Sequence, residues 1–369
     1  MQWIQKTKND LGSTSSLHLD KTMLRDALET HTRKLLRKLS KTGHNMGEPG
    51  ISDAQFLLAS CHGSGALGLV YDPAKACAWY IQASKQNHRE AIYRAGVCHE
   101  LGLGTRQDFG RAIAYYQRGA RLSHSTCMYK LGVILLHGYY KHAPQARLGV
   151  SWIQRAADSI AQALPYAMHA LAMVQLTGEC DKTSLIPDTT YALQLLHRAA
   201  KMGYEASQCK LAEFYETGTW VEVDDVKSIS WYTNAAKQGN PQAALGLSGW
   251  YLTGSNTPGV LPQSDRESYL WAKRAANAPI EARDYYAGEK PIELAVANGC
   301  YLVGYYSENG IGVARDTSTE EAVLWYRKAA CLGHRLAMRR LKALAPTQED
   351  TESSHTSRRR RRKTECLIM

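Results

Sequence analysis

A cysteine close to the end of the chain has the best setting for covalent chemistry. Cys366 is followed by Leu367, Ile368 and Met369, so the last four residues are a cysteine, two aliphatic residues and a methionine. Prenyltransferases act on a cysteine in this position, and a final methionine favours a farnesyl group on the thiol. The sequence therefore predicts lipidation at Cys366.

Six consecutive basic residues stand shortly before this cysteine. They are Arg358, Arg359, Arg360, Arg361, Arg362 and Lys363. One prenyl chain gives only marginal membrane binding, and each basic residue near an anionic leaflet adds about 1 kcal/mol of attraction. We therefore expect residues 345–369 to form a disordered polybasic tail, lipid-anchored at the cytoplasmic face of the plasma membrane. A merely solvated basic tail is the alternative.

The other reactive side chains form no pattern typical of catalysis or metal binding. His99-Glu100 lacks the second histidine of a zinc protease, and the nine cysteines include no Cys-x-x-Cys pair. The stretch GSGALG (Gly63–Gly68) has the letters of a dinucleotide-binding fingerprint, but it follows an expected helix instead of a β-strand. We predict no enzyme activity, no metal and no cofactor.

Composition argues against several classes of protein. The net charge is +11, and the run from Arg358 to Lys363 supplies six of these charges. The mildly basic remainder is unlike a dedicated nucleic-acid binder, which has a basic face throughout its fold. No run of about 18 or more apolar residues is present for a transmembrane helix, and we expect no secretory signal because the first residues include no apolar segment.

One pattern recurs along most of the chain. The stretch Ala54–His88 returns as Ala91–His124 and again as Ala206–Asn240. More divergent copies run through Trp152, Leu195, Trp271 and Trp325. We predict about seven repeats over residues 53–344, with an insertion near residues 277–300, after an N-terminal segment of residues 1–52. Repeats of this length are typical of stacked supersecondary units.

The sequence pattern of each repeat predicts two antiparallel helices joined by a glycine-rich turn. An aspartate is expected to open the second helix by accepting free N–H groups of its first turn. These aspartates are Asp72, Asp108, Asp188, Asp224, Asp265 and Asp316. One hairpin cannot bury its own apolar face, so the units must stack. The predicted fold class is all-α, an α-α superhelical solenoid, with Trp79, Trp152, Trp231 and Trp325 buried between hairpins.

Two residue types recur at equivalent positions of the first helices. Cys61 and Cys98 have similar surroundings, which indicates a small buried residue at one repeat position; a disulfide is the alternative. His62, His99 and His137 also occupy equivalent positions, and we interpret them as half-buried helix residues.

An amphipathic segment precedes the repeats. Leu24, Leu28, Leu35 and Leu39 fall on one side of a helix over residues 24–41, and basic residues fall elsewhere. We expect this helix to cap the first repeat. A helix that lies on a membrane surface is the alternative.

The pair Trp250-Tyr251 is the most distinctive aromatic feature of the repeats. Tyr251 falls on the tyrosine position of the repeat, and Trp250 aligns with Phe214, Cys98 and Cys61. Packing between repeats is the first interpretation of the pair. Binding of a partner protein by Trp250 and Tyr251 is the second, because solenoids bind along their concave surface.

The repeat pattern A-x(4)-L-G/A-x-x-Y-x-x-G-x-G-V-x-x-D-x-x-K-A-x-x-W-Y-x-x-A-A-x-x-G is similar to that of Sel1-like repeats, relatives of tetratricopeptide repeats. Less generic segments, among them SDAQFLLASCHGSG and LSGWYLTGS followed by GVLPQSDRESYLWAKRAA, resemble the fungal chitin synthase regulatory factors. The resemblance covers roughly Ser52 to Leu341. Members of that family commonly also end in a prenylation box.

The resemblance implies a non-enzymatic regulatory subunit that binds, localises and activates a membrane-embedded chitin synthase in cell-wall and septum synthesis. A septum or bud-neck scaffold is a further partner to expect. The alternative is a generic prenylated Sel1-repeat scaffold for another membrane complex, in trafficking or signalling. A secreted Sel1 hydrolase is disfavoured by the absence of a signal peptide and by the prenylation box.

Three segments depart from the family pattern. The part before the repeats is short, and the linker of residues 277–300 is longer than a repeat junction should be. The third repeat replaces the usual glycine-rich turn with HGYYKHAPQARLG. These departures leave the expected fold unchanged, but they limit the transfer of surface contacts in those regions.

Overall fold

The computed structural model describes residues 23–41, 50–159, 163–177, 186–255, 257–280, 291–313 and 317–344. Within these ranges every regular element is a helix, and no residue lies in a β-strand. The predicted all-α fold is therefore confirmed. The chain divides into two compact units, Met1–Met202 and Gly203–Met369.

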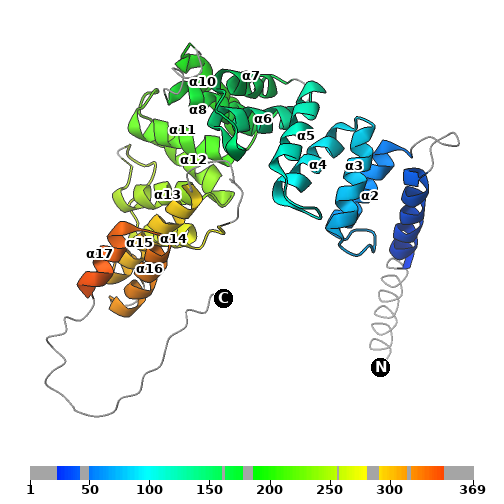
Figure 1. Cartoon of the computed structure of the whole chain (residues 1–369). Helices are drawn as coiled ribbons and strands as arrows, with labels where there is room; N and C mark the ends of the chain where they lie inside the picture. The colour runs from blue at the N-terminus through cyan, green and yellow to red at the C-terminus, as the bar shows by residue number, and fades with distance from the viewer. Residues whose placement is uncertain are drawn as a thin grey trace, which may run out of the picture. The chain divides into compact units, whose positions relative to one another are not determined.

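In the first unit each helix packs against the next one along the chain (Figure 1). A helix over residues 23–41 comes first. It is followed by α2 (Ser52–Ser64), α3 (Pro73–Lys85), α4 (Arg89–Leu101), α5 (Phe109–Arg121), α6 (Ser125–His137), the short 3-10 helix η1 (Tyr139–Lys141), α7 (Ala146–Ala157), α8 (Pro165–Leu176) and α10 (Thr189–Lys201).

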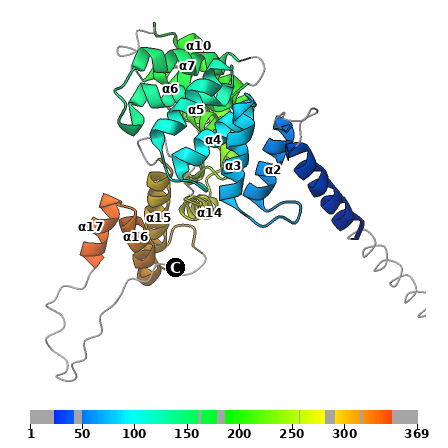
Figure 2. The same cartoon turned by 45° about the vertical axis from the view of Figure 1, so that its right-hand side comes forward.

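The second unit repeats this arrangement, and Figure 2 shows its last helices side by side. It contains α11 (Glu205–Thr217), α12 (Asp225–Lys237), α13 (Pro241–Thr253), α14 (Asp265–Ala276), α15 (Pro291–Asn309), α16 (Thr319–Cys331) and α17 (Arg335–Leu344). In addition, α15 contacts both α13 and α14. Each unit is thus a series of helical hairpins that bury the small residues on their facing sides.

Capping side chains set where the helices begin. The carboxylates of Asp72, Asp108, Asp188 and Asp224 each accept the backbone N–H three residues later at 2.9 Å, as expected. The expectation is wrong for α14, where Ser264 caps the helix and Asp265 is its first residue. Ser318 caps α16, and Asp316 lies outside the described residues. In each case a serine one or two residues from the predicted aspartate reaches the first N–H groups of the helix, so the aspartate is not needed as a cap.

The tryptophans of the second helices are less buried than the sequence predicts. Of the four tryptophans only Trp325 is buried, whereas Trp79, Trp152 and Trp231 are half-buried. The following residue, such as Tyr232 after Trp231, is the one that fills the hairpin. Adjacent residues on a helix point about 100° apart, so at Trp231-Tyr232 the tyrosine is buried and the tryptophan stays half-buried. The Trp152 ring instead packs under the Arg155 guanidinium at 4.6 Å.

Glycines on the first helices make room for these tyrosine rings. A Cβ on Gly246 of α13 would lie 2.7 Å from the Tyr232 ring, and one on Gly304 of α15 would lie 2.8 Å from the Tyr326 ring. Both distances are shorter than atoms tolerate, and both tyrosines are buried. The close approach of neighbouring helices thus depends on the absence of a side chain at these positions.

The helix over residues 23–41 touches the first repeat, but not with its leucines. Its C-terminal end is held by two hydrogen bonds, from Gln55 Nε2 to Ser40 O at 3.0 Å and from Ile51 N to Leu39 O at 2.9 Å. The four leucines of the stripe are exposed. The helix thus contacts the first repeat through a side other than its leucine stripe.

We predict that two alanine substitutions on α13 have opposite effects. Gly246→Ala should lower the free energy of unfolding by about 1–3 kcal/mol, because the new methyl group meets the Tyr232 ring. Gly249→Ala should raise it by about 0.4–1 kcal/mol, because nothing lies within 4 Å of the added Cβ. Thermal unfolding followed by circular dichroism measures both. Equal shifts for the two variants would contradict the proposed packing.

Candidate functional site

The predicted lipidation and membrane-binding residues lie outside the described part of the chain. Cys366 and the run Arg358–Lys363 follow α17, the last described helix, which ends at Leu344. Their roles stay predictions. No described helix has the combined length and hydrophobicity needed to span a bilayer.

The Trp250-Tyr251 pair packs within the second unit. Trp250 is 8% exposed and belongs to a buried cluster with Tyr232 and Leu247. Its indole Nε1–H has no hydrogen-bond partner among the described residues. Tyr251 is half-buried. Packing, the first interpretation of the pair, thus holds for Trp250, and contact of Tyr251 with a partner stays a prediction.

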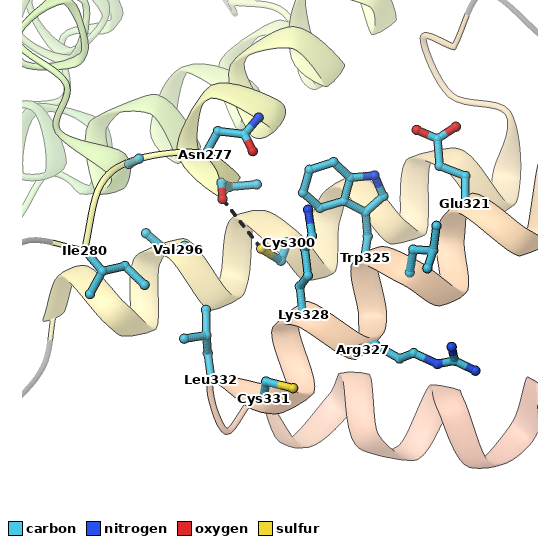
Figure 3. Close-up of a pocket in the computed structure, with 13 residues that line it drawn as sticks. Asn277, Ile280, Val296, Cys300, Glu321, Trp325, Arg327, Lys328, Cys331 and Leu332 are labelled. Atoms are coloured by element: carbon cyan, nitrogen blue, oxygen red, sulfur yellow. Dashed lines mark hydrogen bonds between the residues drawn. The ribbon is translucent and has the colours of Figure 1, made fainter. Parts of the chain in front are cut away.

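A large apolar groove opens elsewhere in the second unit. It has a volume of about 920 Å³ and lies between the end of α14, α15 and α16 (Figure 3). Its wall is formed mainly by apolar side chains, among them Ile280, Val296, Leu324, Trp325 and Leu332. Leu324 is 58% exposed although it lines the groove. This combination of apolar lining and accessibility makes the groove the best candidate for a binding site in the described residues.

The groove exists because the repeat is interrupted here. Helix α15 has 19 residues, whereas the first helix of the preceding repeat, α13, has 13. The early residues of α15 include Val296, which lines one end of the groove together with Ile280. Both residues fall within the segment 277–300 in which the sequence predicts an insertion. The departure from the repeat thus supplies part of the groove wall.

Charged side chains surround the apolar wall on α16. The Lys328 ammonium lies 4.2 Å from the centre of the Trp325 ring, within the range of a cation–π interaction. Arg327 and Glu321 are also at the groove (Figure 3). An apolar floor with two cations beside it suits a partner segment that combines apolar side chains with an acidic residue.

The cysteine on the α15 wall of the groove is buried. The Cys300 thiol donates a hydrogen bond to the Ala276 carbonyl oxygen at 3.7 Å, and burial raises the pKa of this thiol. A protonated, buried thiol is a poor nucleophile. Among the described residues no cluster of histidine, cysteine, aspartate or glutamate is arranged to hold a metal ion.

A second recurring feature is a buried tyrosine that donates its hydroxyl to a glutamate. Tyr232 Oη donates to Glu216 at 2.6 Å, and Tyr326 Oη donates to Glu308 at 2.7 Å. Tyr116 makes the equivalent bond to Glu100. We call this pair the tyrosine–glutamate clamp. Burial first, and the carboxylate second, raise the pKa of Tyr232, so the hydroxyl stays a donor.

The clamp in the first unit has further partners. Glu100 is 1% exposed, and it also accepts a hydrogen bond from Tyr140 Oη at 2.6 Å. Lys130 Nζ lies 3.5 Å from the same carboxylate. Tyr140 follows α6 in the unusual turn of the third repeat, so that turn closes over Glu100. We did not anticipate the clamp from the sequence, although the recurrence of a tyrosine 16 or 18 residues after a glutamate was the available signal.

The equivalent histidines differ in burial. His62 and His99 are buried, whereas His137 is exposed, so the single expectation of half-burial is wrong for all three. Burial lowers the pKa of His62 and of His99, and nearby Lys75 and Arg111 lower it further. The pKa of His99 is lowered because a charged imidazole would lose its hydration there.

Comparison with known protein families shows to which family this chain is related. The model of the Sel1 repeat matches residues 52–88, 89–124, 125–159, 165–204, 205–240, 241–279 and 297–334. The chain belongs to the Sel1 repeat family. Two solved structures share the fold: a Sel1 repeat protein from Oxalobacter formigenes (22% identity, TM-score 0.59, 86% of each chain covered) and the protective antigen c5321 of uropathogenic Escherichia coli (21% identity, TM-score 0.55, 85% of this chain and 67% of that one).

Several curated relatives of this Sel1 repeat protein are fungal. Chitin synthase regulatory factor 3 of Schizosaccharomyces pombe is 32% identical over 97% of this chain and 36% of its own length. The chitin synthase regulators SKT5 of Malassezia restricta and Saccharomyces cerevisiae are 36% and 33% identical, over 87% and 90% of this chain and 20% and 43% of their own lengths. The chain thus spans less than half the length of these relatives.

The buried histidines make the stability of this Sel1 repeat protein depend on pH. Because the folded-state pKa of His99 lies below its unfolded value, the unfolded chain binds more protons as the pH falls below about 6.5. The free energy of unfolding should therefore decrease from that pH downward. His99→Phe keeps a flat ring against Tyr115, whose ring lies 5.6 Å away, but removes this titration.

We predict that the melting temperature of His99→Phe falls less than that of the wild type between pH 7.5 and pH 5.5, by about 2 °C or more. His137→Phe is the control, because His137 is exposed, and its melting temperature should follow the wild type. Differential scanning calorimetry at the two pH values provides the comparison. A parallel decrease in all three proteins would show that His99 does not cause the acid sensitivity.

Proposed function

We propose that this chain is a non-enzymatic regulatory subunit that binds and activates a membrane-embedded chitin synthase. The observation that carries the proposal is the similarity of almost the whole chain to proteins named chitin synthase regulators, at 32% identity over 97% of its length for one of them. Because the chain spans only part of those relatives, activation of the synthase is a proposal for this chain.

The groove is the surface proposed to receive the synthase. Its apolar wall and the cations Arg327 and Lys328 favour a partner segment with apolar and acidic side chains. Leu324 is accessible at this wall and would become buried on binding. Binding at this surface requires no chemistry from the chain itself.

The tail is proposed to hold the complex at the membrane. A farnesyl group on Cys366 and the charges of Arg358–Lys363 together satisfy the requirement for two signals. They would place the chain on the inner leaflet of the plasma membrane, at septum or growth sites where a septum or bud-neck scaffold is a further proposed partner. The repeats would then present the groove to the synthase in the same membrane.

We predict that a charge in the groove weakens activation. Leu324→Glu should raise the concentration of protein needed for half-maximal chitin synthesis by about tenfold, the effect of losing one well-packed contact. Leu270→Glu is the matched control, because Leu270 is 46% exposed on α14 and does not line the groove. Incorporation of UDP-N-acetylglucosamine into chitin by synthase-containing membranes is the measurement.

Three outcomes of this assay bear on the proposal. Chitin made by the purified chain without synthase membranes would overturn the non-enzymatic role. Equal potency of Leu324→Glu and wild type would remove the groove from the interface. Absence of any activation by the wild type would favour the alternative, a prenylated scaffold for another membrane complex in trafficking or signalling.

We predict that the two tail signals act separately. Cys366→Ser should leave a weak membrane fraction that high salt removes, because exposed charges are screened over about 8–10 Å. Replacing Arg358 through Lys363 with glutamine should instead leave the lipid alone, with marginal affinity and spread to internal membranes. Fractionation of cells at low and high salt measures both. A Cys366→Ser protein that stays on membranes at high salt as the wild type does would make another contact the main anchor.

A further inference from the structure

The helix over residues 23–41 is attached to the first repeat by one side only. Arg33 Nη1 donates to Gly68 O at 3.2 Å, and Ser40 is 1% exposed against α2. Leu36 and Glu29 on the same side are half-buried. At about 100° per residue these four side chains fall within about 60° of one another around the helix. We call this the attached side.

Four leucines form a stripe on another side of the same helix. Leu24, Leu28, Leu35 and Leu39 also fall within about 60° of one another, and the stripe is centred about 120° from the attached side. These side chains are between 41% and 63% exposed. Four aligned leucines left in water are unusual for a soluble surface, where apolar side chains are normally scattered. The described residues of the first unit provide no cover for this stripe.

Basic side chains flank the stripe. Residues 23–41 include six basic and two acidic residues, a net charge of +4. Lys34, Arg37, Lys38 and Lys41 are exposed and lie between the stripe and the attached side. Arg25, on the opposite flank, pairs with Glu29 at 3.0 Å and is itself exposed. Long basic side chains beside an apolar stripe can extend toward lipid head groups while the leucines enter the acyl region.

We propose that the helix over residues 23–41 lies in the surface of an anionic membrane, with Leu24, Leu28, Leu35 and Leu39 inserted. The charge of the helix matches anionic head groups. A second copy of the helix fits less well, because the seam of a coiled coil that uses Leu28 and Leu35 would also contain either His31 and Lys38 or Arg25 and Thr32, depending on its register. Since the attached side is turned away from the stripe, the helix can stay bound to the first repeat while it contacts the membrane.

This membrane contact is independent of the tail and does not require lipidation of Cys366. The test therefore uses the unprenylated full chain with Cys366→Ser and with Arg358 through Lys363 replaced by glutamine. We call this protein the tail-neutral chain. Its binding is measured by co-sedimentation with vesicles of phosphatidylcholine, with and without phosphatidylserine. The tail-neutral chain should bind the anionic vesicles, and the bound fraction should decrease as salt is added.

Leu28→Glu with Leu35→Glu, placed in the tail-neutral chain, removes the centre of the stripe. The partition coefficient on anionic vesicles should fall on the order of a hundredfold, because two leucines no longer leave water and two negative charges are added. Leu103→Glu with Leu148→Glu is the matched control, with the same change in charge at two leucines that are 43% and 45% exposed elsewhere in the first unit. This control should bind about as the tail-neutral chain does.

Four outcomes would overturn the proposal. The first is a tail-neutral chain that does not bind anionic vesicles, and the second is equal binding of the two double variants. The third is equal binding to vesicles without phosphatidylserine, which would remove the electrostatic match. The fourth is a dimer in solution that only the helix variant converts to monomer, seen by light scattering, because a second copy would then cover the stripe. Circular dichroism of both variants shows whether they remain folded.

Discussion

The buried tyrosine hydroxyl is the main constraint on the hairpins that contain Tyr116, Tyr232 and Tyr326. A tyrosine ring fills the space between neighbouring helices in both units, and its polar end is carried into the interior with it. A buried hydroxyl without a partner costs about 1–3 kcal/mol. The glutamates of the tyrosine–glutamate clamp supply that partner, as Glu216 does for Tyr232 at 2.6 Å. A bulky ring, a carboxylate and a glycine opposite the ring therefore occur together.

This constraint also explains where the repeat can vary. In a hairpin with the clamp, the positions that complete it and receive the ring are restricted, whereas the segments between hairpins are not. The third repeat uses its altered turn to bring Tyr140 onto Glu100 at 2.6 Å. The longer α15 uses its additional residues to form one end of the groove. Both departures add a feature to a scaffold whose hairpin packing is preserved.

The periodic part of the structure could be predicted from the sequence. The helical hairpins and the aspartate caps at Asp72, Asp108, Asp188 and Asp224 follow from local sequence patterns. The choice between Trp231 and Tyr232 as the buried ring could not be predicted, because both are aromatic and only their angle around the helix distinguishes them.

The candidate site was less predictable for a related reason. The groove depends on Ile280, Val296 and Leu324 lining the same space, and the first two of these residues lie between two repeats, whereas Leu324 lies in the later one. The leucine stripe of residues 24–41 was visible, but which side of the helix is attached depends on contacts with Gln55 and Gly68. Amphipathic pattern alone shows that a face exists and does not show what covers it.

The central claim is that the repeats act on the partner while separate elements provide the membrane contact. The most direct test is a titration of synthase-containing membranes with a chain that carries Cys366→Ser, Arg358 through Lys363 replaced by glutamine, and Leu28→Glu with Leu35→Glu. Loss of membrane residence lowers the effective concentration, so the account predicts the same maximal synthase activity as wild type at a half-maximal concentration at least about tenfold higher. A lower maximum at saturating protein would contradict it, because the membrane elements would then take part in activation itself.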